Sequence, residues 1–464
     1  MIPRTLPRVS WKLLIAAVGA HVRLDLEGMT DIEREAVREA WADASADDSD
    51  EARVVDLSVV SEATALPGLL AGLSQRVTLA AIEAQRGKLW MLHATGVALD
   101  DGRVVVFVGP SGRGKTTAAR ALGTRFGYVS DETVGIDAAG RVYPYRKPLS
   151  IIERAGAPKV QRAASDLGLR ALPEAPLRLA AVVLLDRSVE GPEVPVIETI
   201  DLGDALGDLV AQSSYLGDMP NPLQTIATHV QAVGGVQVVH YREAASLGEI
   251  VEAVAEARAA STDAGGLTAH EALPARTEPS ASAPGEPRYS RAVVHDTLTL
   301  TDPDRVVLLQ RNHTGTGTVR VLGGIAPALW RAADAATRAD LVAAAIAAYG
   351  EPAEPAEDKV ARAVDDLVVA GMLVEETGWG ICNDVAWTDS GDRVVVLALS
   401  ELTASPLALE GSAALIWRAL AEGRAPVGVI VERVAESAGV DAEAIEADVA
   451  EFLDSLANQR LVNF

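Results

Sequence analysis

The sequence is poor in cysteine, in basic residues and in long apolar runs, and each shortage excludes a class of protein. Its one cysteine, Cys382, leaves no partner for an internal disulfide and no thiolate cluster for a metal. The seven histidines lie too far apart in sequence for a recognisable metal-ligand spacing. No stretch approaches the ~20 apolar residues of a membrane-spanning helix. With 41 Lys and Arg against 65 Asp and Glu, the net charge of −24 disfavours nucleic acid and anionic membranes as partners.

What the chain does contain is enough apolar material for more than one core. Hydrophobic residues make up 49% of its 464 residues, and a chain of this length is expected to form two or three domains. Basic residues precede a short apolar run at 13–20, which faintly resembles a signal peptide. Because that run is at the short limit for such a signal, we expect a cytoplasmic protein.

A glycine-rich motif at 104–117, VVVFVGPSGRGKTT, is the feature around which the chain is organised. Its residues fit a Walker A loop, in which backbone N–H groups surround phosphates while a lysine and a hydroxyl reach the nucleotide and Mg²⁺. Apolar β-formers precede the loop and a helix-compatible segment follows, so a phosphate would meet a helix N-terminus. The motif predicts that ATP or GTP with Mg²⁺ binds at Gly109, Ser111, Gly112, Gly114, Lys115, Thr116 and Thr117.

The residues on either side of this loop indicate a particular class of nucleotide-binding protein. Two strand-like runs, 88–99 and 103–108, are separated by a DDG turn signal, so the strand before the loop has an antiparallel neighbour. His93 lies in the first run, and the acidic pair Asp131 and Glu132 follows the loop and its helix. This order resembles that of the HPr kinase/phosphorylase-like P-loop ATPases, whose active sites combine such a histidine, a Walker A loop and two aspartates.

The resemblance covers about residues 20–257 and implies an α/β domain with a mixed sheet. It implies catalytic roles for Asp131, His93 and Glu132, with Asp131 taking the proton from an attacking hydroxyl. Glu132 stands where the family has its second aspartate. The family's later glycine-rich signature loop has no counterpart that we find, which argues against HPr as the substrate.

Chemistry alone leaves other roles open for the charged residues of this region. A carboxylate such as Asp131 could instead orient Mg²⁺ together with Thr116. Asp186 closes an apolar run at 180–185 and is a competing Mg²⁺ ligand. The basic residues Arg146, Lys147 and Arg187 are read as solvated surface side chains, with neutralisation of phosphate charge as the alternative.

Composition changes after the first 258 residues. Residues 259–287 are rich in Ala, Ser, Thr, Gly, Pro and Glu and have no apolar period, which is typical of a flexible linker. We therefore expect a nucleotide-binding domain at 1–258, a linker at 259–289, and further domains at 290–380 and 381–464.

The last two domains are predicted to be copies of one unit. The segment DPDRVVLLQ at 302–310 matches SGDRVVVLALS at 390–400, and later Trp-Arg and helix-ending glycine landmarks repeat at a nearly constant offset. A fixed offset across several landmarks indicates duplication. Strands followed by three helices predict a winged helix-turn-helix. However, 291–464 carries 13 basic against 27 acidic residues, a net charge of −14, so DNA is not its expected ligand.

The second copy resembles the PqqD-like family in its pattern PLALEGSAALIW at 406–417 and in the helix spacing that follows. These RiPP recognition elements bind leader peptides of ribosomally made, modified peptides. The resemblance implies an edge strand at 405–410 that accepts the leader as an added strand, beside one apolar stripe of the last helix. The expected peptide-binding residues are Leu407, Leu409, Val449, Phe452 and Leu453.

Three functions fit these patterns. The chain is an ATP-dependent kinase-like protein of RiPP biosynthesis, a non-catalytic recognition adaptor that binds nucleotide and delivers a precursor to other biosynthetic enzymes, or an HPr-type regulator. The expected partner in the first two is a precursor leader peptide. Neither the acceptor nor the choice between ATP and GTP follows from the sequence.

Overall fold

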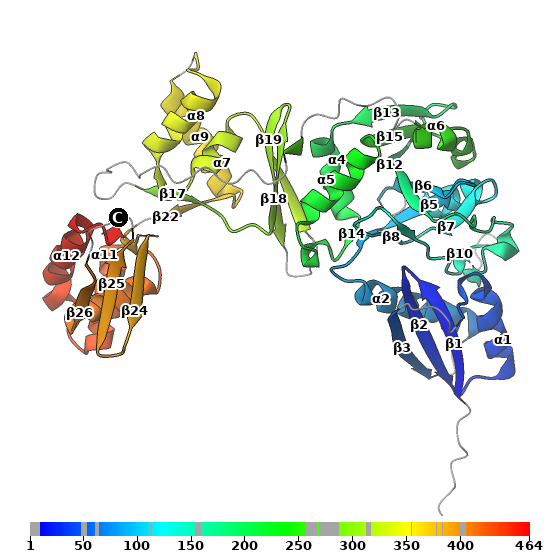
Figure 1. The fold of residues 1–464 in the computed structure, drawn as a ribbon, viewed down its shortest axis with the longest axis horizontal. Coiled ribbons are helices and arrows are strands. Elements are labelled where there is room, and N and C mark those ends of the chain that lie inside the picture. The colour runs from blue at the N-terminus through cyan, green and yellow to red at the C-terminus, as the bar shows by residue number, and fades with distance from the viewer. Residues whose placement is uncertain are drawn as a thin grey trace, which may run out of the picture. The chain divides into compact units, whose positions relative to one another are not determined.

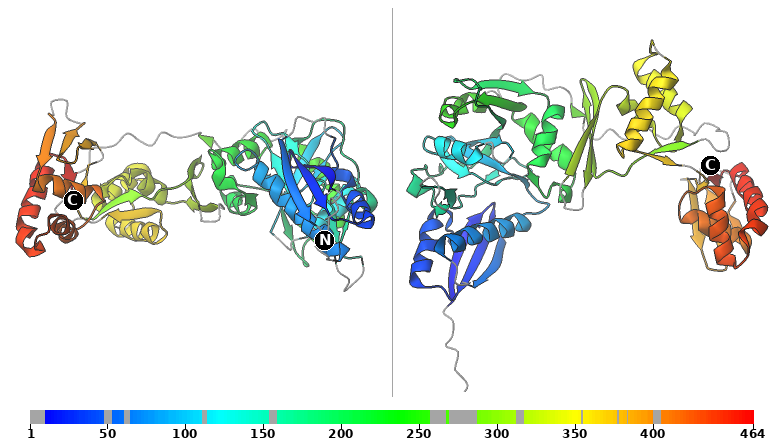
Figure 2. Two further views of the ribbon diagram at one scale, coloured as in Figure 1. Left: turned by 90° about the horizontal axis from the view of Figure 1, so that it is seen from below. Right: turned by 180° about the vertical axis from the view of Figure 1, so that it is seen from behind.

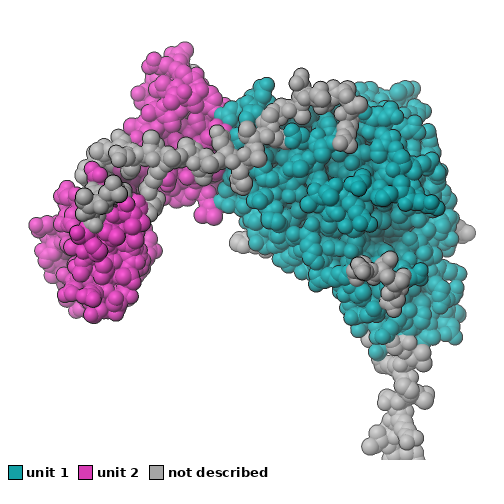
Figure 3. Space-filling model, in the orientation of Figure 1, with its two compact units in different colours: residues 1–271, 294–322 teal, residues 272–293, 323–464 magenta. Residues whose placement is uncertain are grey.

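The computed structural model describes residues 10–47, 53–60, 65–110, 114–153, 159–256, 267–268, 287–311, 317–353, 355–376, 378–382, 384–399 and 405–464. They form two compact units (Figure 3). Unit 1 comprises residues 1–271 and 294–322, and unit 2 comprises 272–293 and 323–464. Among the described residues, no helix is both long and apolar enough to cross a membrane.

A small sheet with two helices opens the chain. Its strands run in the order β1-β2-β3, and α2 lies across the sheet (Figures 1 and 2). The side chains of Val22, Leu24 and Leu26 are fully buried in the cluster that includes Leu73 and Val77 of α2. The apolar run at 13–20 thus belongs mainly to a β-strand. The bounds are β1 (Ser10–Ala17), β2 (Ala20–Glu27), α1 (Asp31–Ala40), β3 (Arg53–Val60) and α2 (Leu66–Ala84).

A six-stranded mixed sheet of order β13-β15-β12-β6-β5-β7 forms the centre of unit 1. Strands β6, β12 and β15 are parallel, and β5 pairs antiparallel with β6, which confirms the predicted hairpin. Helices α3 and α6 pack on one face, whereas α4 and α5 pack on the other. The strands are β5 (Ala94–Ala98), β6 (Arg103–Val108), β7 (Gly127–Ser130), β12 (Arg178–Arg187), β13 (Val196–Ile200) and β15 (Val236–Tyr241). The helices are α3 (Lys115–Gly123), α4 (Leu202–Ala211), α5 (Pro222–Ala232) and α6 (Val251–Glu256).

A second, four-stranded sheet of order β14-β4-β8-β9 flanks the first. The run 88–99, expected as one strand, is divided between the two sheets, and His93 is the residue between β4 and β5. A short hairpin of β10 and β11 follows. The bounds are β4 (Trp90–Leu92), β8 (Val134–Ile136), β9 (Val142–Tyr143), β10 (Leu149–Ile151), β11 (Val160–Arg162) and β14 (Ser213–Ser214).

The predicted duplication is confirmed: in each copy one strand is followed by three antiparallel strands, three helices and a closing strand that pairs with the first. The first copy consists of β17 (Arg288–Arg291), β18 (Asp296–Thr301), β19 (Asp304–Arg311), β20 (Gly317–Leu322), α7 (Ala326–Ala332), α8 (Arg338–Tyr349), α9 (Ala356–Val369) and β22 (Leu373–Glu376). The second consists of β23 (Gly380–Ile381), β24 (Val385–Asp389), β25 (Arg393–Ala398), β26 (Leu407–Glu410), α10 (Ser412–Ala421), α11 (Val427–Ala438), α12 (Ala442–Asn458) and β27 (Val462–Asn463). Two short strands, β16 (Leu267–Thr268) and β21 (Ala336–Thr337), pair with β18 and β17.

The sheet of the first copy belongs to unit 1, which differs from the expected boundaries at 258 and 290. The physical reason is burial, because Leu298, Leu300, Val307 and Leu309 enter the apolar cluster formed by α4 and α5. Polar contacts follow the same interface. Arg305 pairs with Asp201 at the start of α4, and the Gln224 side chain donates to the Thr297 carbonyl at 2.8 Å.

Candidate functional site

A cavity of about 350 Å³ in unit 1 brings together residues from four parts of the chain. It combines the β4–β5 junction, the start of α3, the turn after β7 and the β10–β11 region. Most of the predicted catalytic and nucleotide residues are present, whereas Ser111 and Gly112 lie outside the described residues. The lining consists of His93, Gly114, Lys115, Thr116, Thr117, Asp131, Glu132, Lys147, Ser150 and Lys159.

The start of α3 forms one wall. Gly114 is its N-cap, with a left-handed φ of 87° that favours glycine, and no side chain caps the helix. The first-turn N–H groups of such a helix have no intrahelical acceptors and attract anions. Lys115 is buried, and its ammonium donates to the carbonyl oxygens of Gly109 at 2.5 Å and Pro110 at 3.2 Å. Burial lowers the pKa of Lys115. The predicted strand-loop-helix context is therefore confirmed at the strand and at the helix.

The acidic pair lies at the end of β7, where it meets a buried lysine. Asp131 Oδ1 accepts a hydrogen bond from the Tyr128 hydroxyl at 3.0 Å. Lys147 Nζ lies 3.5 Å from Asp131 Oδ1 and 3.0 Å from Glu132 Oε2. Burial disfavours the charge of Lys147, but Asp131 and Glu132 outweigh that effect and raise its pKa. Burial, followed by the Asp131 charge, raises the pKa of Tyr128 well above its usual value.

His93 lies where the chain leaves one sheet for the other. Its backbone N–H donates to the Gln212 carbonyl at 2.7 Å, and the next residue, Ala94, donates to the Glu132 carbonyl at 3.1 Å. The first bond attaches the junction to the end of α4, and the second attaches it to the acidic turn. Burial, and secondly the nearby charge of Lys115, lowers the pKa of His93, so its imidazole favours the neutral form.

Asp186, the competing metal candidate, is not brought to this cavity. Side chains alternate along β12, so Leu185 faces α3 whereas Leu184 faces α4 and α5. Asp186 follows Leu184 on that second face, where its Oδ2 lies 2.9 Å from His240 Nδ1. Arg187 lies on the other face, with Leu185, and close to Gly114. A Cβ atom added to that glycine would be 3.7 Å from the Arg187 Cδ.

Sequence reasoning missed or misread three residues that line the cavity, Lys147, Ser150 and Lys159, and misread the neighbouring Arg146. Lys147 and Arg146 were read as surface residues, but Lys147 is buried, and the Arg146 guanidinium pairs with Asp43 at 3.2 Å. The misreading is explained by the local sequence PYRKP, which resembles an exposed turn. Ser150 and Lys159 were not singled out, and no motif marks them.

The second copy has the expected edge strand. Strand β26 pairs only with β25 among the described strands, in a sheet of order β24-β25-β26. Of the five expected peptide-binding residues, Leu409, Val449 and Leu453 are buried core side chains. Leu407 and Phe452 are half-buried and pack against the same core, so they retain surface for a ligand.

Comparison with known families bears on both copies. Two segments of the chain match the family model of coenzyme PQQ synthesis protein D (PqqD). They are residues 305–373 and 395–462, one in each copy. No curated protein matches the chain. Matching solved structures include "TbiB1 in Complex with the TbiA(beta) Leader Peptide", which is 31% identical, covers 18% of this chain and 94% of that one, and has a TM-score of 0.17.

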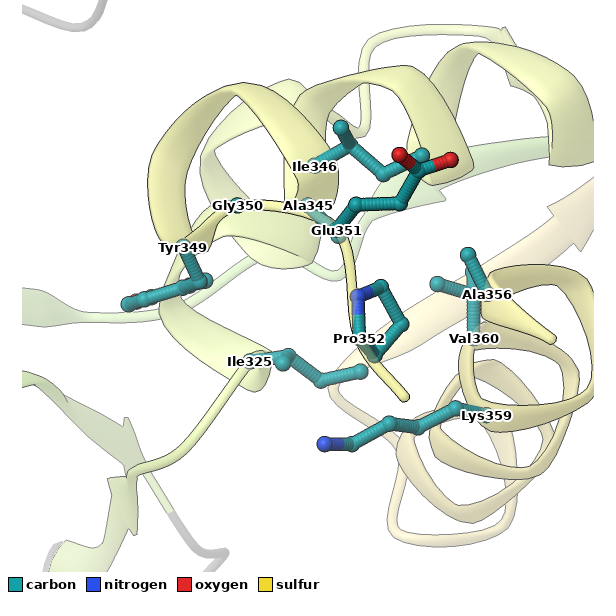
Figure 4. A pocket seen from close by; sticks show the side chains of 10 residues that line it. All are labelled: Ile325, Ala345, Ile346, Tyr349, Gly350, Glu351, Pro352, Ala356, Lys359 and Val360. Carbon is teal, nitrogen blue, oxygen red and sulfur yellow. The ribbon is translucent and has the colours of Figure 1, made fainter. Parts of the chain in front are cut away.

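The first PqqD-like copy contains a smaller cavity of about 160 Å³ between α8 and α9 (Figure 4). The side chains of Ile325, Ile346 and Val360 line it, and the ammonium of Lys359 extends below Pro352. None of the predicted site residues contributes to it.

Proposed function

We propose that this chain is an ATP-dependent, kinase-like protein of RiPP biosynthesis. It binds a precursor leader peptide through its second PqqD-like copy and uses the cavity of unit 1 to phosphorylate or otherwise activate the peptide. The observation that supports this most is the convergence of Lys115, the uncapped start of α3 and the Asp131 carboxylate in one cavity. The match of both copies to the PqqD family supports the peptide partner.

The residues of the cavity fit a nucleotide with Mg²⁺. A buried lysine, an uncapped helix start and a left-handed glycine suit a triphosphate, and the Thr116 hydroxyl is a suitable Mg²⁺ ligand. When bound, ATP supplies the γ-phosphoryl group. Lys115 neutralises charge on the β- and γ-phosphates. Neutral His93 does not add a positive charge to the cavity.

In the proposed transfer, the substrate hydroxyl oxygen forms a bond to the γ-phosphorus while the bond between that phosphorus and the β,γ-bridging oxygen breaks. ADP is the leaving group. Asp131 accepts the hydroxyl proton, in line with its position in the same cavity as Lys115. The products are a phosphorylated peptide and ADP.

The leader peptide is proposed to add to the free side of β26. An extended peptide satisfies the unpaired backbone groups of an edge strand, and alternate side chains provide specificity. Leu407 on the strand and Phe452 on α12 contribute the accessible apolar surface. The acidic composition of the C-terminal region favours leaders that carry Lys or Arg.

The adaptor function is the second candidate. It is favoured by the ion pairs of Lys147 with both carboxylates, which resemble a structural network as much as a catalytic one. In that case unit 1 binds nucleotide without turnover.

Incubation of the full chain with γ-labelled ATP and a leader-bearing precursor tests the proposal. We expect label on the peptide from the wild type and none from Asp131→Asn, with nucleotide affinity retained in that variant. Ser165→Ala, outside the cavity lining, is the control and should retain transfer. Leader binding without any transfer or hydrolysis favours the adaptor, and unchanged transfer by Asp131→Asn refutes the proposed base.

A further inference from the structure

We infer that Lys147 is a positioning residue that holds Asp131 and Glu132 as one ion-paired group and keeps a divalent cation from between them. The inference deepens the proposed function and rests on it in one respect, namely the role of Asp131 as proton acceptor. It decides between the two roles that the sequence leaves open for Asp131, base and metal ligand.

The geometry around the ammonium supports this assignment. Lys147 Nζ lies 3.0 Å from Glu132 Oε2, 3.5 Å from Asp131 Oδ1 and 3.3 Å from the Pro148 carbonyl oxygen. The ammonium donates a hydrogen bond to the Pro148 carbonyl oxygen and forms ion pairs with both carboxylates. The side chains of Lys147 and Asp131 are only 8% and 4% exposed, so water contributes little to their solvation. A cation bound between the two carboxylates would have to displace this ammonium.

The loop that carries Lys147 is fixed on both sides. Tyr145 donates its backbone N–H to the Val129 carbonyl at 3.0 Å, and its hydroxyl lies 2.9 Å from Thr78 Oγ1 in a buried contact. Pro144 and Pro148 restrict the backbone around this segment. The ammonium is therefore held against the acidic turn by a rigid loop.

The two oxygens of the Asp131 carboxylate have different surroundings. Its Oδ1 accepts a hydrogen bond from the Tyr128 hydroxyl and is also the oxygen that forms the ion pair with Lys147. Within the described part of the chain, Oδ2 has no hydrogen-bond partner, so it is the oxygen available to a substrate proton. With Lys147 in place, Thr116 and the nucleotide phosphates would be the ligands of Mg²⁺.

A divalent cation serves as the probe, without nucleotide, so the test does not depend on turnover. Mn²⁺ binding to the full chain is followed by electron paramagnetic resonance. Lys147→Met removes the counter-charge from two adjacent carboxylates, and we expect it to bind Mn²⁺ about tenfold more tightly, or more, than the wild type. The wild type and Lys147→Arg should bind equally weakly. Lys159→Met removes another charge from the cavity lining and should not gain affinity.

The double variant Lys147→Met/Glu132→Gln localises the effect, because it should lose the gained Mn²⁺ affinity. Equal Mn²⁺ binding by the wild type and Lys147→Met would overturn the inference. So would unfolding of both Lys147→Met and Lys147→Gln with Lys147→Arg folded, since Lys147 would then be a structural residue. If the wild type binds no nucleotide, the proposed function fails, while the Mn²⁺ comparison still reports on Lys147.

Discussion

Asp296 accepts a hydrogen bond from the backbone N–H of Leu223 at 2.8 Å, and so caps a helix 73 residues earlier in the chain. Helix α5 lacks a local cap, because the Asn221 side chain makes no capping hydrogen bond and Pro222 has no N–H to donate. The sheet of the first PqqD-like copy therefore completes a helix of unit 1. The same helix carries His229, whose ring stacks on the ring of Trp90 with centroids 5.8 Å apart. Trp90 lies in β4, three residues before His93.

Replacement of Asp296 should destabilise unit 1. Asp296→Ala leaves the Leu223 N–H buried without its acceptor, and we expect a loss of about 1–2 kcal/mol in unfolding free energy. Asp296→Asn keeps an acceptor oxygen and should lose less. Urea unfolding of the full chain measures both, and equal stability of Asp296→Ala and wild type would contradict the capping role.

Removal of the sheet of the first copy should also destabilise unit 1, and by more than the loss of one cap. A fragment ending at residue 258 lacks Leu298, Leu300, Val307 and Leu309, which are buried in the α4–α5 cluster. Each buried leucine is worth about 2–5 kcal/mol when reduced to alanine, so this fragment should be less stable than one ending at 322 by several kcal/mol. Thermal melts of the two fragments provide the comparison, and coincident melts would show that the sheet is dispensable.

Nucleotide binding should depend on Lys115. Its charge-assisted hydrogen bonds to phosphate are worth about 1.5–3 kcal/mol, so Lys115→Ala should weaken Mg²⁺-ATP binding about 10- to 100-fold. The exposed Lys12 of β1 offers a control of equal charge, and Lys12→Ala should bind as the wild type does. Isothermal titration of the full chain decides the matter; identical affinities in all three proteins would remove the nucleotide assignment.

Stability should fall as the solution becomes acidic. Burial lowers the pKa of His229, and burial with Lys115 lowers that of His93, below the usual value of about 6.5. Between about 6.5 and these lower values, the unfolded chain binds more protons than the folded chain, so stability decreases as pH falls through that window. His229→Phe keeps a ring on Trp90 without a proton to bind. Its urea midpoint should change less between pH 7.5 and 5.5 than that of the wild type.

Leader affinity should depend on Phe452. Its ring is half-buried beside the core of the second copy, and truncation of an aromatic anchor commonly costs at least about 2 kcal/mol of binding. Phe452→Ala should therefore weaken a labelled leader more than tenfold in fluorescence anisotropy. Val429→Ala on α11, also partly exposed, is the matched control. Equal losses in both variants would indicate a general loss of structure.

Local patterns predicted the parts of the fold that depend on nearby residues. The Walker-type strand and helix, the hairpin at the DDG turn and the duplicated units all follow from short-range periodicity and turn chemistry. The division at His93 could not be predicted, because both halves of the run are buried and only their strand partners separate them. The orientation of Asp186 likewise depends on which face of β12 is covered by α3.

Burial of charged groups was the hardest feature to predict. Lys147 is buried because two carboxylates from a distant turn compensate its desolvation, and no local pattern shows such pairing. The packing partner of the sheet of the first copy could not be predicted for the same reason. Its apolar residues predict a buried face, but the sequence does not say that α4 and α5 cover it.

The interleaving of the two units bears on how this protein can diversify. The chain passes from one unit to the other at 271–272, at 293–294 and again at 322–323. A single genetic crossover just before β18 would therefore divide the core that α4 and α5 share with the sheet of the first copy, whereas a crossover just before β23 would leave the core of the second copy intact. Unit 1 and the sheet of the first copy are thus expected to be inherited together, while the second copy is free to change by exchange of the whole copy as well as by point substitution along β26 and α12.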